Sequence, residues 1–217
     1  MFIGHFGLAL AAKRVAPRTS LGTLAAASQW LDLVWPLLLL LGVERVRVAP
    51  GWTAFTPLDF EYYPWTHSLA MALAWSAAFG VAYRFRTGYA RGAATVAALV
   101  ASHWFLDAVV HRPDLPLAPG GTARVGLGLW NSVPATLAVE VPLFAAGLVA
   151  YATGTRPRNR AGAIAIWSLV AFLGIAYAGN AFSRPPPSST AIGVAGLSLW
   201  LVVLWFAWAD KNREPSP

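Results

Sequence analysis

The chain has 217 residues, of which 57% are hydrophobic and only 12% are charged. Soluble domains carry about 25% charged residues, so this composition excludes an ordinary soluble domain and indicates a single integral membrane domain. Cysteine is absent, which excludes disulfide bonds and thiolate metal ligands. The formal net charge is +7, but the Lys and Arg residues stand in short blocks between apolar runs. Membrane topology explains that arrangement, so we expect membrane lipids and no nucleic acid as partners.

Apolar runs follow one another along the chain, and most have the length of about 20 residues that a bilayer core requires. They predict an all-α fold, a polytopic helical membrane bundle of six to seven transmembrane helices. The expected helices cover residues 2–16, 23–43, 66–85, 92–111, 132–154, 162–182 and 189–210. The first is short for a membrane span, so we expect it to tilt or to lie partly in the interface.

The segments between these helices are rich in proline, glycine and polar residues. The prolines of "SRPPPSS", residues 183–189, cannot continue a helix and predict a stiff extended connector. We expect one membrane domain over residues 1–210, with the motifs in residues 1–150 and accessory helices over 160–210. Residues 211–217 are expected to form a polar tail.

The basic residues are divided unequally between the two sides that alternating helices define. Most of the 16 Lys and Arg residues fall on the side that also carries the C-terminus: Lys13, Arg14, Arg18, Arg84, Arg86, Arg91, Arg156, Arg158, Arg160, Lys211 and Arg213. The positive-inside rule places this side in the cytoplasm. We therefore expect a multi-pass protein of the cytoplasmic (inner) membrane, with its N-terminus outside and its C-terminus in the cytoplasm.

The stretch "SHWFLDAVVHRPDLP", residues 102–116, places His103, Asp107 and His111 at intervals of four at the end of an apolar run. Four residues turn an α-helix by about 400°, so successive members are offset by only about 40° and all three face the same side. The outer two are about 12 Å apart along the axis, so the three cannot all reach one ion. His103 and Asp107 are therefore candidates for one metal ion, and His111 for a second ion or for the substrate.

Other ionisable residues fall toward the same predicted face of the membrane. His5 lies in the first expected helix, Asp32 in the second and Glu140 in the fifth, while His67 begins the third after the loop acid Asp59. A charge near the bilayer centre costs at least ~2.5–3.5 kcal/mol on insertion scales, which makes such residues candidates for function. Glu140 has two interpretations: a ligand or general base, or a structural group that hydrogen-bonds a tryptophan indole or a neighbouring helix.

Imidazole and carboxylate groups together form the usual ligand set of zinc, iron and manganese. We therefore predict a divalent transition metal bound by these residues: His5, Asp32, His67, His103, Asp107 and, at the periphery, His111. A metal ion would also offset the cost of burying the acids. A proton relay, a structural polar network and a site for a non-metal ligand are the alternatives.

Two short segments beside these residues have expected structural roles. Ser68, which follows His67, is expected to cap the third helix or to hold a histidine in place. In "GLGLWNS", residues 126–132, either Asn131 or Ser132 is expected to cap the fifth helix.

Together these motifs resemble those of the YdjM-like family, which is described as predicted inner-membrane metal-dependent hydrolases. The matching pieces are His5 in "GHFGLALA", Asp32, "THS" at residues 66–68 and "SHWFLD" at residues 102–107. The likeness covers the first half of the chain, and "HRPDLPL" and "GLGLWNS" extend it toward residue 150. Where the family often has a paired acid in its second helix, this chain has Asp32 alone. The resemblance implies a membrane-bound metal-dependent hydrolase.

The leading hypothesis is a hydrolase that acts on a lipid or a lipid-linked ester or phosphoester, with its site toward the outer face. The metal would activate water, Glu140 or Asp59 would accept its proton, and Arg112 would stabilise the developing anion. One rival is a membrane transporter or permease. Another is a structural membrane protein in which the metal joins helices without turnover. The sequence points to no particular substrate, metal or protein partner.

Overall fold

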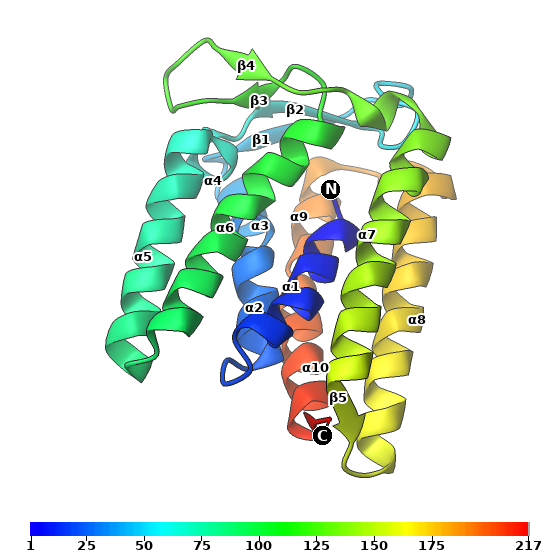
Figure 1. Ribbon diagram of the computed structural model, residues 1–217. Coiled ribbons are helices and arrows are strands. Elements are labelled where there is room, and N and C mark those ends of the chain that lie inside the picture. Colours follow the sequence, from blue (N-terminus) through cyan, green and yellow to red (C-terminus); the bar gives the residue numbers. More distant parts are fainter. Residues whose placement is uncertain (217) are drawn as a thin grey trace.

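The computed structural model describes residues 1–216, which form a helical bundle closed at one end by short strands (Figure 1). The helices are α1 (Ile3–Val15), α2 (Leu21–Ser28), α3 (Trp30–Leu40), α4 (Pro64–His67), α5 (Leu69–Thr87), α6 (Ala90–Val110), α7 (Val133–Gly154), α8 (Arg160–Phe182), α9 (Ser189–Gly196) and α10 (Leu199–Lys211). A short 3-10 turn, η1 (Leu129–Asn131), precedes α7. The all-α prediction is confirmed for the bundle, and the strands are small additions at its two ends.

The strands form antiparallel pairs at opposite ends of the bundle. They are β1 (Arg45–Val48), β2 (Leu58–Tyr62), β3 (Leu115–Pro116), β4 (Arg124–Val125), β5 (Thr155–Pro157) and β6 (Arg213–Pro215). The pairs β1–β2 and β3–β4 lie over one end of the helices, where we call them the cap (Figure 1). The pair β5–β6 lies at the other end and joins the chain's last strand to the end of α7.

Four helices are long and apolar enough to cross a membrane, as in an integral membrane protein. They are α6, α7, α8 and the continuous segment Ser189–Lys211, which contains α9 and α10; the pair α2–α3 would make a fifth if it counts as one bent span. The expected six to seven spans are therefore not confirmed. The first expected helix, α1, has 13 residues and is only about 20 Å long, against a hydrocarbon core of about 30 Å.

The second expected helix, residues 23–43, is broken near its middle. It bends by 58° between α2 and α3, with Gln29 in the break and Asp32 in the first turn of α3. Similarly, the third expected helix is divided at Ser68 into α4 and α5. The breaks matter for function because Asp32 and His67 both lie within a few residues of one.

Two serines cap helices as expected. The Ser68 hydroxyl accepts a hydrogen bond from the backbone N–H of Met71 at 3.2 Å, in the first turn of α5. The Ser132 hydroxyl accepts one from the N–H of Ala135 at 3.3 Å, in the first turn of α7. Each side chain satisfies a backbone donor that has no partner inside its own helix.

Helix α1 lies inside the bundle, flanked by α2, α6 and α7 (Figure 1). Phe6, Ala9 and Leu10 on α1 are fully buried. Gly147 lets α7 approach α1 closely, because a Cβ atom at this position would stand only 2.0 Å from the Gly7 carbonyl oxygen. Close glycine contacts of this kind are typical of helices packed within membranes.

We expect Gly147→Ala to destabilise the bundle by about 1–3 kcal/mol, because the added methyl group meets backbone that cannot move aside. Gly174→Ala is the matched control. Gly174 lies on α8, where an added Cβ would contact nothing within 4 Å, so helix propensity alone should make that change neutral or stabilising. Thermal unfolding of the two variants in the same detergent measures the difference. An unchanged melting temperature for Gly147→Ala would contradict the close packing of α1 on α7.

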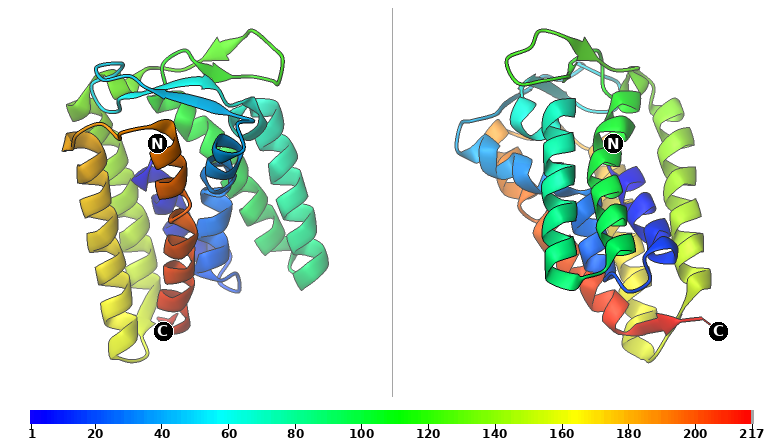
Figure 2. Two further views of the ribbon diagram at one scale, coloured as in Figure 1. Left: turned by 180° about the vertical axis from the view of Figure 1, so that it is seen from behind. Right: turned by 60° about the vertical axis from the view of Figure 1, so that its left-hand side comes forward.

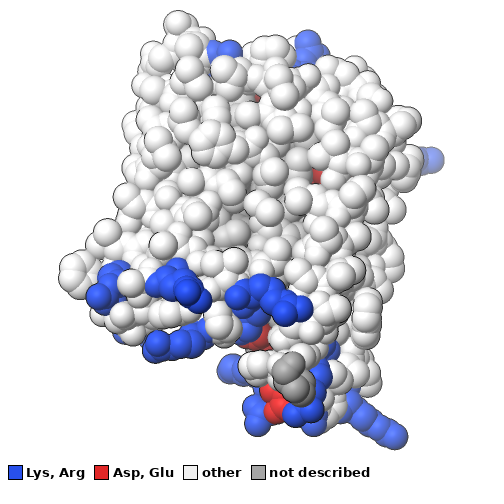
Figure 3. Space-filling view, in the orientation of Figure 1, with Lys and Arg blue, Asp and Glu red and all other residues white. Residues whose placement is uncertain are grey.

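Lys and Arg side chains gather at the end of the molecule opposite the cap (Figure 3). The connections α1–α2, α5–α6 and α7–α8 lie together at this end with the C-terminal segment (Figure 1). Basic blocks that are far apart in the sequence therefore converge on one face, as the alternating topology predicts.

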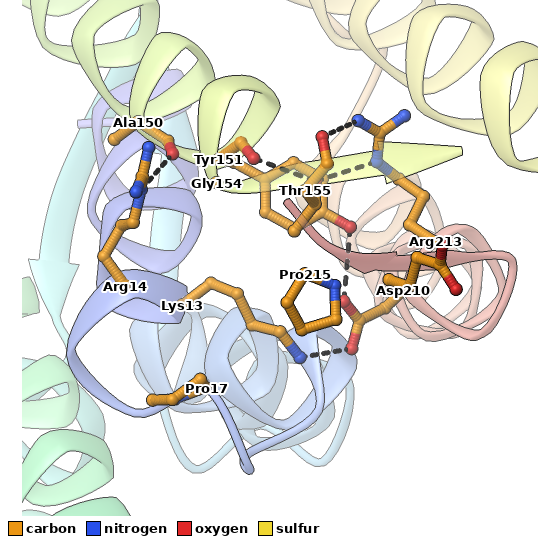
Figure 4. A pocket seen from close by; sticks show the side chains of 11 residues that line it. Lys13, Arg14, Pro17, Ala150, Tyr151, Gly154, Thr155, Asp210, Arg213 and Pro215 are labelled. Atoms are coloured by element: carbon orange, nitrogen blue, oxygen red, sulfur yellow. Dashed lines mark hydrogen bonds and ion pairs between the residues drawn. The ribbon is translucent and has the colours of Figure 1, made fainter. Parts of the chain in front are cut away.

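Asp210 joins the helices at this basic end (Figure 4). Its Oδ2 accepts hydrogen bonds from Lys13 Nζ at 2.7 Å and from the backbone N–H of Leu21 at 2.9 Å, and its Oδ1 accepts one from the Tyr151 hydroxyl at 3.2 Å. One carboxylate on α10 thus connects α1, α2 and α7. Beyond it, much of the expected polar tail forms strand β6 against β5.

Candidate metal centre

The predicted ligands come from four helices and meet just beneath the cap. His5 lies on α1, Asp32 on α3, His67 at the end of α4, and His103 and Asp107 one turn apart on α6. The three histidines and Asp107 are buried, while the Asp32 side chain is 23% exposed. Two overlapping groups have ligand atoms within 4.8 Å of one another: His5, His103 and Asp107, and Asp32, His67 and His103.

Two imidazoles and two carboxylates alternate around one point. His67 Nε2 lies 3.3 Å from Asp32 Oδ1 and 3.7 Å from Asp107 Oδ2. His103 Nε2 lies 3.3 Å from Asp107 Oδ2 and 3.7 Å from Asp32 Oδ2. A tetrahedral metal with bonds of about 2.1 Å holds neighbouring ligand atoms about 3.4 Å apart. These four distances are close to that value, and the ligand atoms converge as two overlapping groups of three that share His103.

The second ring nitrogen of His103, Nδ1, is hydrogen-bonded to the backbone. Its Nδ1 donates to the carbonyl oxygen of Ser28 at 2.7 Å, so Nδ1 carries the proton. Ser28 is the last residue of α2, where the bend toward α3 begins. The helix break thus supplies both the carboxylate of Asp32 and the carbonyl group that orients His103.

The far nitrogen of His67 is fixed by a longer chain of contacts. The Thr66 hydroxyl donates to Glu44 Oε2 at 2.7 Å, so its oxygen must accept from His67 Nδ1, which is also 2.7 Å away. Metal-binding histidines usually donate their second N–H to a protein acceptor in this way, which fixes the tautomer and the ring orientation. The neutral forms of His67 and His103 therefore both present a bare Nε2 to the carboxylates.

The Nε2 atoms of these two histidines are the atoms that suit the cluster to binding a metal ion. His103 Nε2 is buried and makes no hydrogen bond within residues 1–216, although carboxylate oxygens face it at 3.3 and 3.7 Å. A nitrogen lone pair and carboxylate oxygens repel one another in a buried site unless a proton or a metal ion lies between them. The histidine and carboxylate donors here suit zinc, iron or manganese.

His5 approaches the cluster from α1. Its Nε2 donates to Asp107 Oδ1 at 3.1 Å, and its ring stacks on that of His103 with centroids 3.7 Å apart. The amino group of Met1 also donates to Asp107 Oδ1. In this arrangement His5 orients Asp107 and packs against His103, so it supports both side chains.

Glu44 was not among the residues expected from the sequence. It lies between α3 and β1 and is fully buried. Its Oε1 accepts from the backbone N–H groups of Trp65 and Thr66 at 2.8 and 2.9 Å. These N–H groups belong to the first turn of α4 and have no acceptor inside that helix. The one available signal was the proline that begins the "PWTH" turn, whose free N–H groups require an acceptor from elsewhere.

The contacts of Glu140 match the structural one of its two interpretations. Its Oε2 accepts from the backbone N–H groups of Phe2 and Gly4 at 2.8 and 3.3 Å, so it caps α1, the neighbouring helix that carries His5. Its Oε1 is buried and has no hydrogen-bond partner within residues 1–216. A role for Glu140 as a base stays a prediction.

The structure does not bring Asp59 and Arg112 to the cluster. Asp59 pairs with Arg47 across the β1–β2 hairpin, where the strand register places the two residues opposite each other. Arg112 donates to the carbonyl oxygen of Trp52 at 2.9 Å and lies over the Trp52 ring. Both side chains therefore stabilise the cap, and neither lines the cavity described next.

A cavity of about 590 Å³ leads to the metal-site residues. Asp32, His67 and Asp107 line it on one side, and His111 lines it together with Trp130. Most of the remaining wall is apolar and comes from α3, α8, α9, α10 and the cap. The cluster is therefore open to a ligand on the side of Asp32.

His111 lies in the wall of this cavity, outside both groups of converging ligands. Its Nδ1 donates to Asp114 Oδ1 at 3.0 Å, and the Tyr63 hydroxyl donates to the same oxygen at 3.2 Å. Burial lowers the pKa of His111 below its ordinary value, with Asp114 opposing the shift. Burial, followed by the charge of Asp114, raises the pKa of Tyr63. Burial thus favours the neutral imidazole, and within residues 1–216 the Nε2 atom of His111 makes no hydrogen bond.

The fold and the site together define a class of protein: a helical bundle of the membrane type with a buried histidine and carboxylate cluster that could hold a metal ion. Comparisons with known protein families, with curated proteins and with solved structures gave no match. The function is therefore inferred from the chemistry of the site itself.

Proposed function

We propose that this protein is a membrane-bound metal-dependent hydrolase that acts on a lipid or a lipid-linked ester or phosphoester. One observation carries the proposal. The Nε2 atoms of His67 and His103 face the carboxylates of Asp32 and Asp107 at 3.3–3.7 Å, at the end of a cavity with largely apolar walls. The resemblance of the motifs to the YdjM-like hydrolases agrees with this proposal.

The residues divide into those that hold the metal and those that keep its ligands in place. Asp32, His67 and His103 would bind the ion, with Asp107 facing both histidines, and the ion would supply Lewis acidity and activate water at neutral pH. Ser28 and Thr66 hold the two histidines in the tautomer that leaves Nε2 free. The largely apolar walls lower the local dielectric constant, which strengthens electrostatic interactions in the site.

His111 is the best-placed side chain to move a proton. Asp114 and Tyr63 orient its ring from behind, and its Nε2 remains free to accept a proton on the cavity side. A histidine held by a carboxylate in this way is a common general base. We therefore assign to His111 the proton transfer that the sequence alone suggested for Glu140 or Asp59.

The open approach to the cluster favours turnover over a purely structural metal. Structural zinc sites are closed by four protein ligands, whereas catalytic sites bind the ion with three and keep a position open for water or substrate. The converging group of Asp32, His67 and His103 supplies three. Here the Asp32 side chain is 23% exposed and shares the cavity wall with His67 and Asp107. We further propose that the basic end faces the cytoplasm of the inner membrane, so that the cluster opens toward the outer leaflet.

Purified protein loaded with zinc, manganese or iron should release product from a panel of lipid esters and phosphoesters. His111→Gln should lower kcat by about 10²- to 10⁴-fold, because it removes the group that accepts the proton, while leaving the bound metal in place. Asp59→Asn is the matched control and should leave kcat unchanged, since Asp59 pairs only with Arg47 in the cap. No turnover with any loaded metal on any lipid of the panel would contradict the hydrolase proposal.

A further inference from the structure

The cavity extends from the cluster to the connection between α8 and α9. Phe172 and Ala176 of α8 form one wall, and Ile192 and Ala195 of α9 form the other. The connection, residues 183–188, bridges the two helices at the level of the chain's N-terminus, as the view from behind shows (Figure 2). Next to this connection the lining turns polar, with Asn180, Ser183 and Arg184.

Arg184 is exposed at this rim. Within residues 1–216 its guanidinium group makes no ion pair, no hydrogen bond and no contact over an aromatic ring. The other arginines near the cap each have such a contact: Arg45, Arg47, Arg112 and Arg124. A free guanidinium at the mouth of an apolar cavity is complementary to an anion that carries apolar chains.

Helices α8 and α9, which line this part of the cavity, have the apolar character of lipid-facing helices. Both helices belong to segments that are long and apolar enough to cross a membrane. Large apolar side chains are exposed on them and on α10, including Ile175, Phe182, Val194 and Leu201. Arg184 follows the last residues of α8, so it lies near the depth where lipid phosphates are found.

We propose that the substrate is an anionic phospholipid whose phosphate binds Arg184 while its acyl chains lie between α8 and α9. Arg184 is then the residue that determines specificity. Cleavage rests on the proposed function, but binding does not. With the phosphate held at the rim, the bond that reaches the cluster is an acyl ester. The water oxygen bonds to the acyl carbon, the ester C–O bond breaks, and the two water protons end on the released carboxylic acid and alcohol.

Binding can be measured apart from turnover with a lipid that has no acyl ester. The probe is an ether-linked phosphatidylglycerol in neutral detergent, compared with the dialkylglycerol that lacks the phosphate and with glycerol phosphate, which lacks the chains. We expect the wild type to bind the ether phospholipid at least 10-fold more tightly than the dialkylglycerol, with no competition from glycerol phosphate. Arg184→Gln should lose most of this preference, and Arg124→Gln, the matched exposed control, should keep it.

Two binding results would overturn the proposal, and one result of the turnover assay would do so as well. One is an Arg184→Gln variant that binds the ether phospholipid as the wild type does. The other is glycerol phosphate that competes as well as the phospholipid, which would mean a site for a soluble phosphate ester. Failure of the hydrolase function gives a different result. Binding would still depend on Arg184, but the metal-loaded protein would release no lysophospholipid from diacyl phosphatidylglycerol. Acyl release that is indifferent to Arg184 would support the hydrolase and overturn the assignment of Arg184.

Discussion

His103→Ala and Asp107→Ala should each purify without the transition metal that the wild-type protein binds. Both side chains belong to the cluster, and Asp107 lies within 3.7 Å of both His67 and His103. Removing either one leaves an incomplete ligand set with an unpaired buried charge or lone pair. Mass spectrometry of the detergent-purified protein should find about one equivalent of metal in the wild type, as a single tetrahedral site requires, and a small fraction of that in either variant.

The matched controls lie close to the site but outside the cluster. His111→Gln and Asp59→Asn should keep the metal, because His111 binds Asp114 and Asp59 binds Arg47. Removing the metal from the wild type should also lower its melting temperature, since an ion that binds only the folded state stabilises it. A wild-type protein that takes up no zinc, manganese or iron would contradict the metal centre. The cluster would then be better explained as a proton relay.

The pairing of His103 with Asp107 could be predicted because it depends only on helix geometry. Residues four apart on one helix stay on the same side, and this holds whatever surrounds α6. The helical character of the bundle could be predicted for a similar reason, since long apolar runs require internally hydrogen-bonded backbone. His5, Asp32 and His67 could be suggested only from their common predicted face, because their convergence depends on how α1, α3 and α4 pack.

What could not be predicted depends on chain breaks and on contacts between distant segments. Hydropathy gives no sign of the 58° bend after Ser28, yet that bend exposes the carbonyl group that orients His103. Asp59 and Arg112 have the right chemistry for a site, but the register of the β1–β2 hairpin pairs Asp59 with Arg47 instead. Glu44 stands beside arginines in the sequence and looks like a surface acid, although it is fully buried.

Glu44→Gln should weaken metal binding by about 10- to 100-fold, although Glu44 does not touch the cluster. Two backbone N–H groups, those of Trp65 and Thr66, face Oε1, so the amide oxygen of glutamine must take that position. Its NH₂ group then faces the Thr66 hydroxyl oxygen. Thr66 can no longer donate to residue 44, so it donates to His67 Nδ1 and moves the imidazole proton to Nε2. A protonated Nε2 cannot bind a metal.

Competition with a chelator of known zinc affinity measures this change, and the resonances of the imidazole nitrogens report the tautomer of His67. Thr66→Val should weaken binding by a similar factor. The double variant should be little worse than either single one, because both changes break the same chain of contacts. Glu61→Gln is the matched control, since Glu61 pairs with Arg47 at the surface of the cap. Zinc affinity that is unchanged in Glu44→Gln would mean that His67 binds no metal through Nε2.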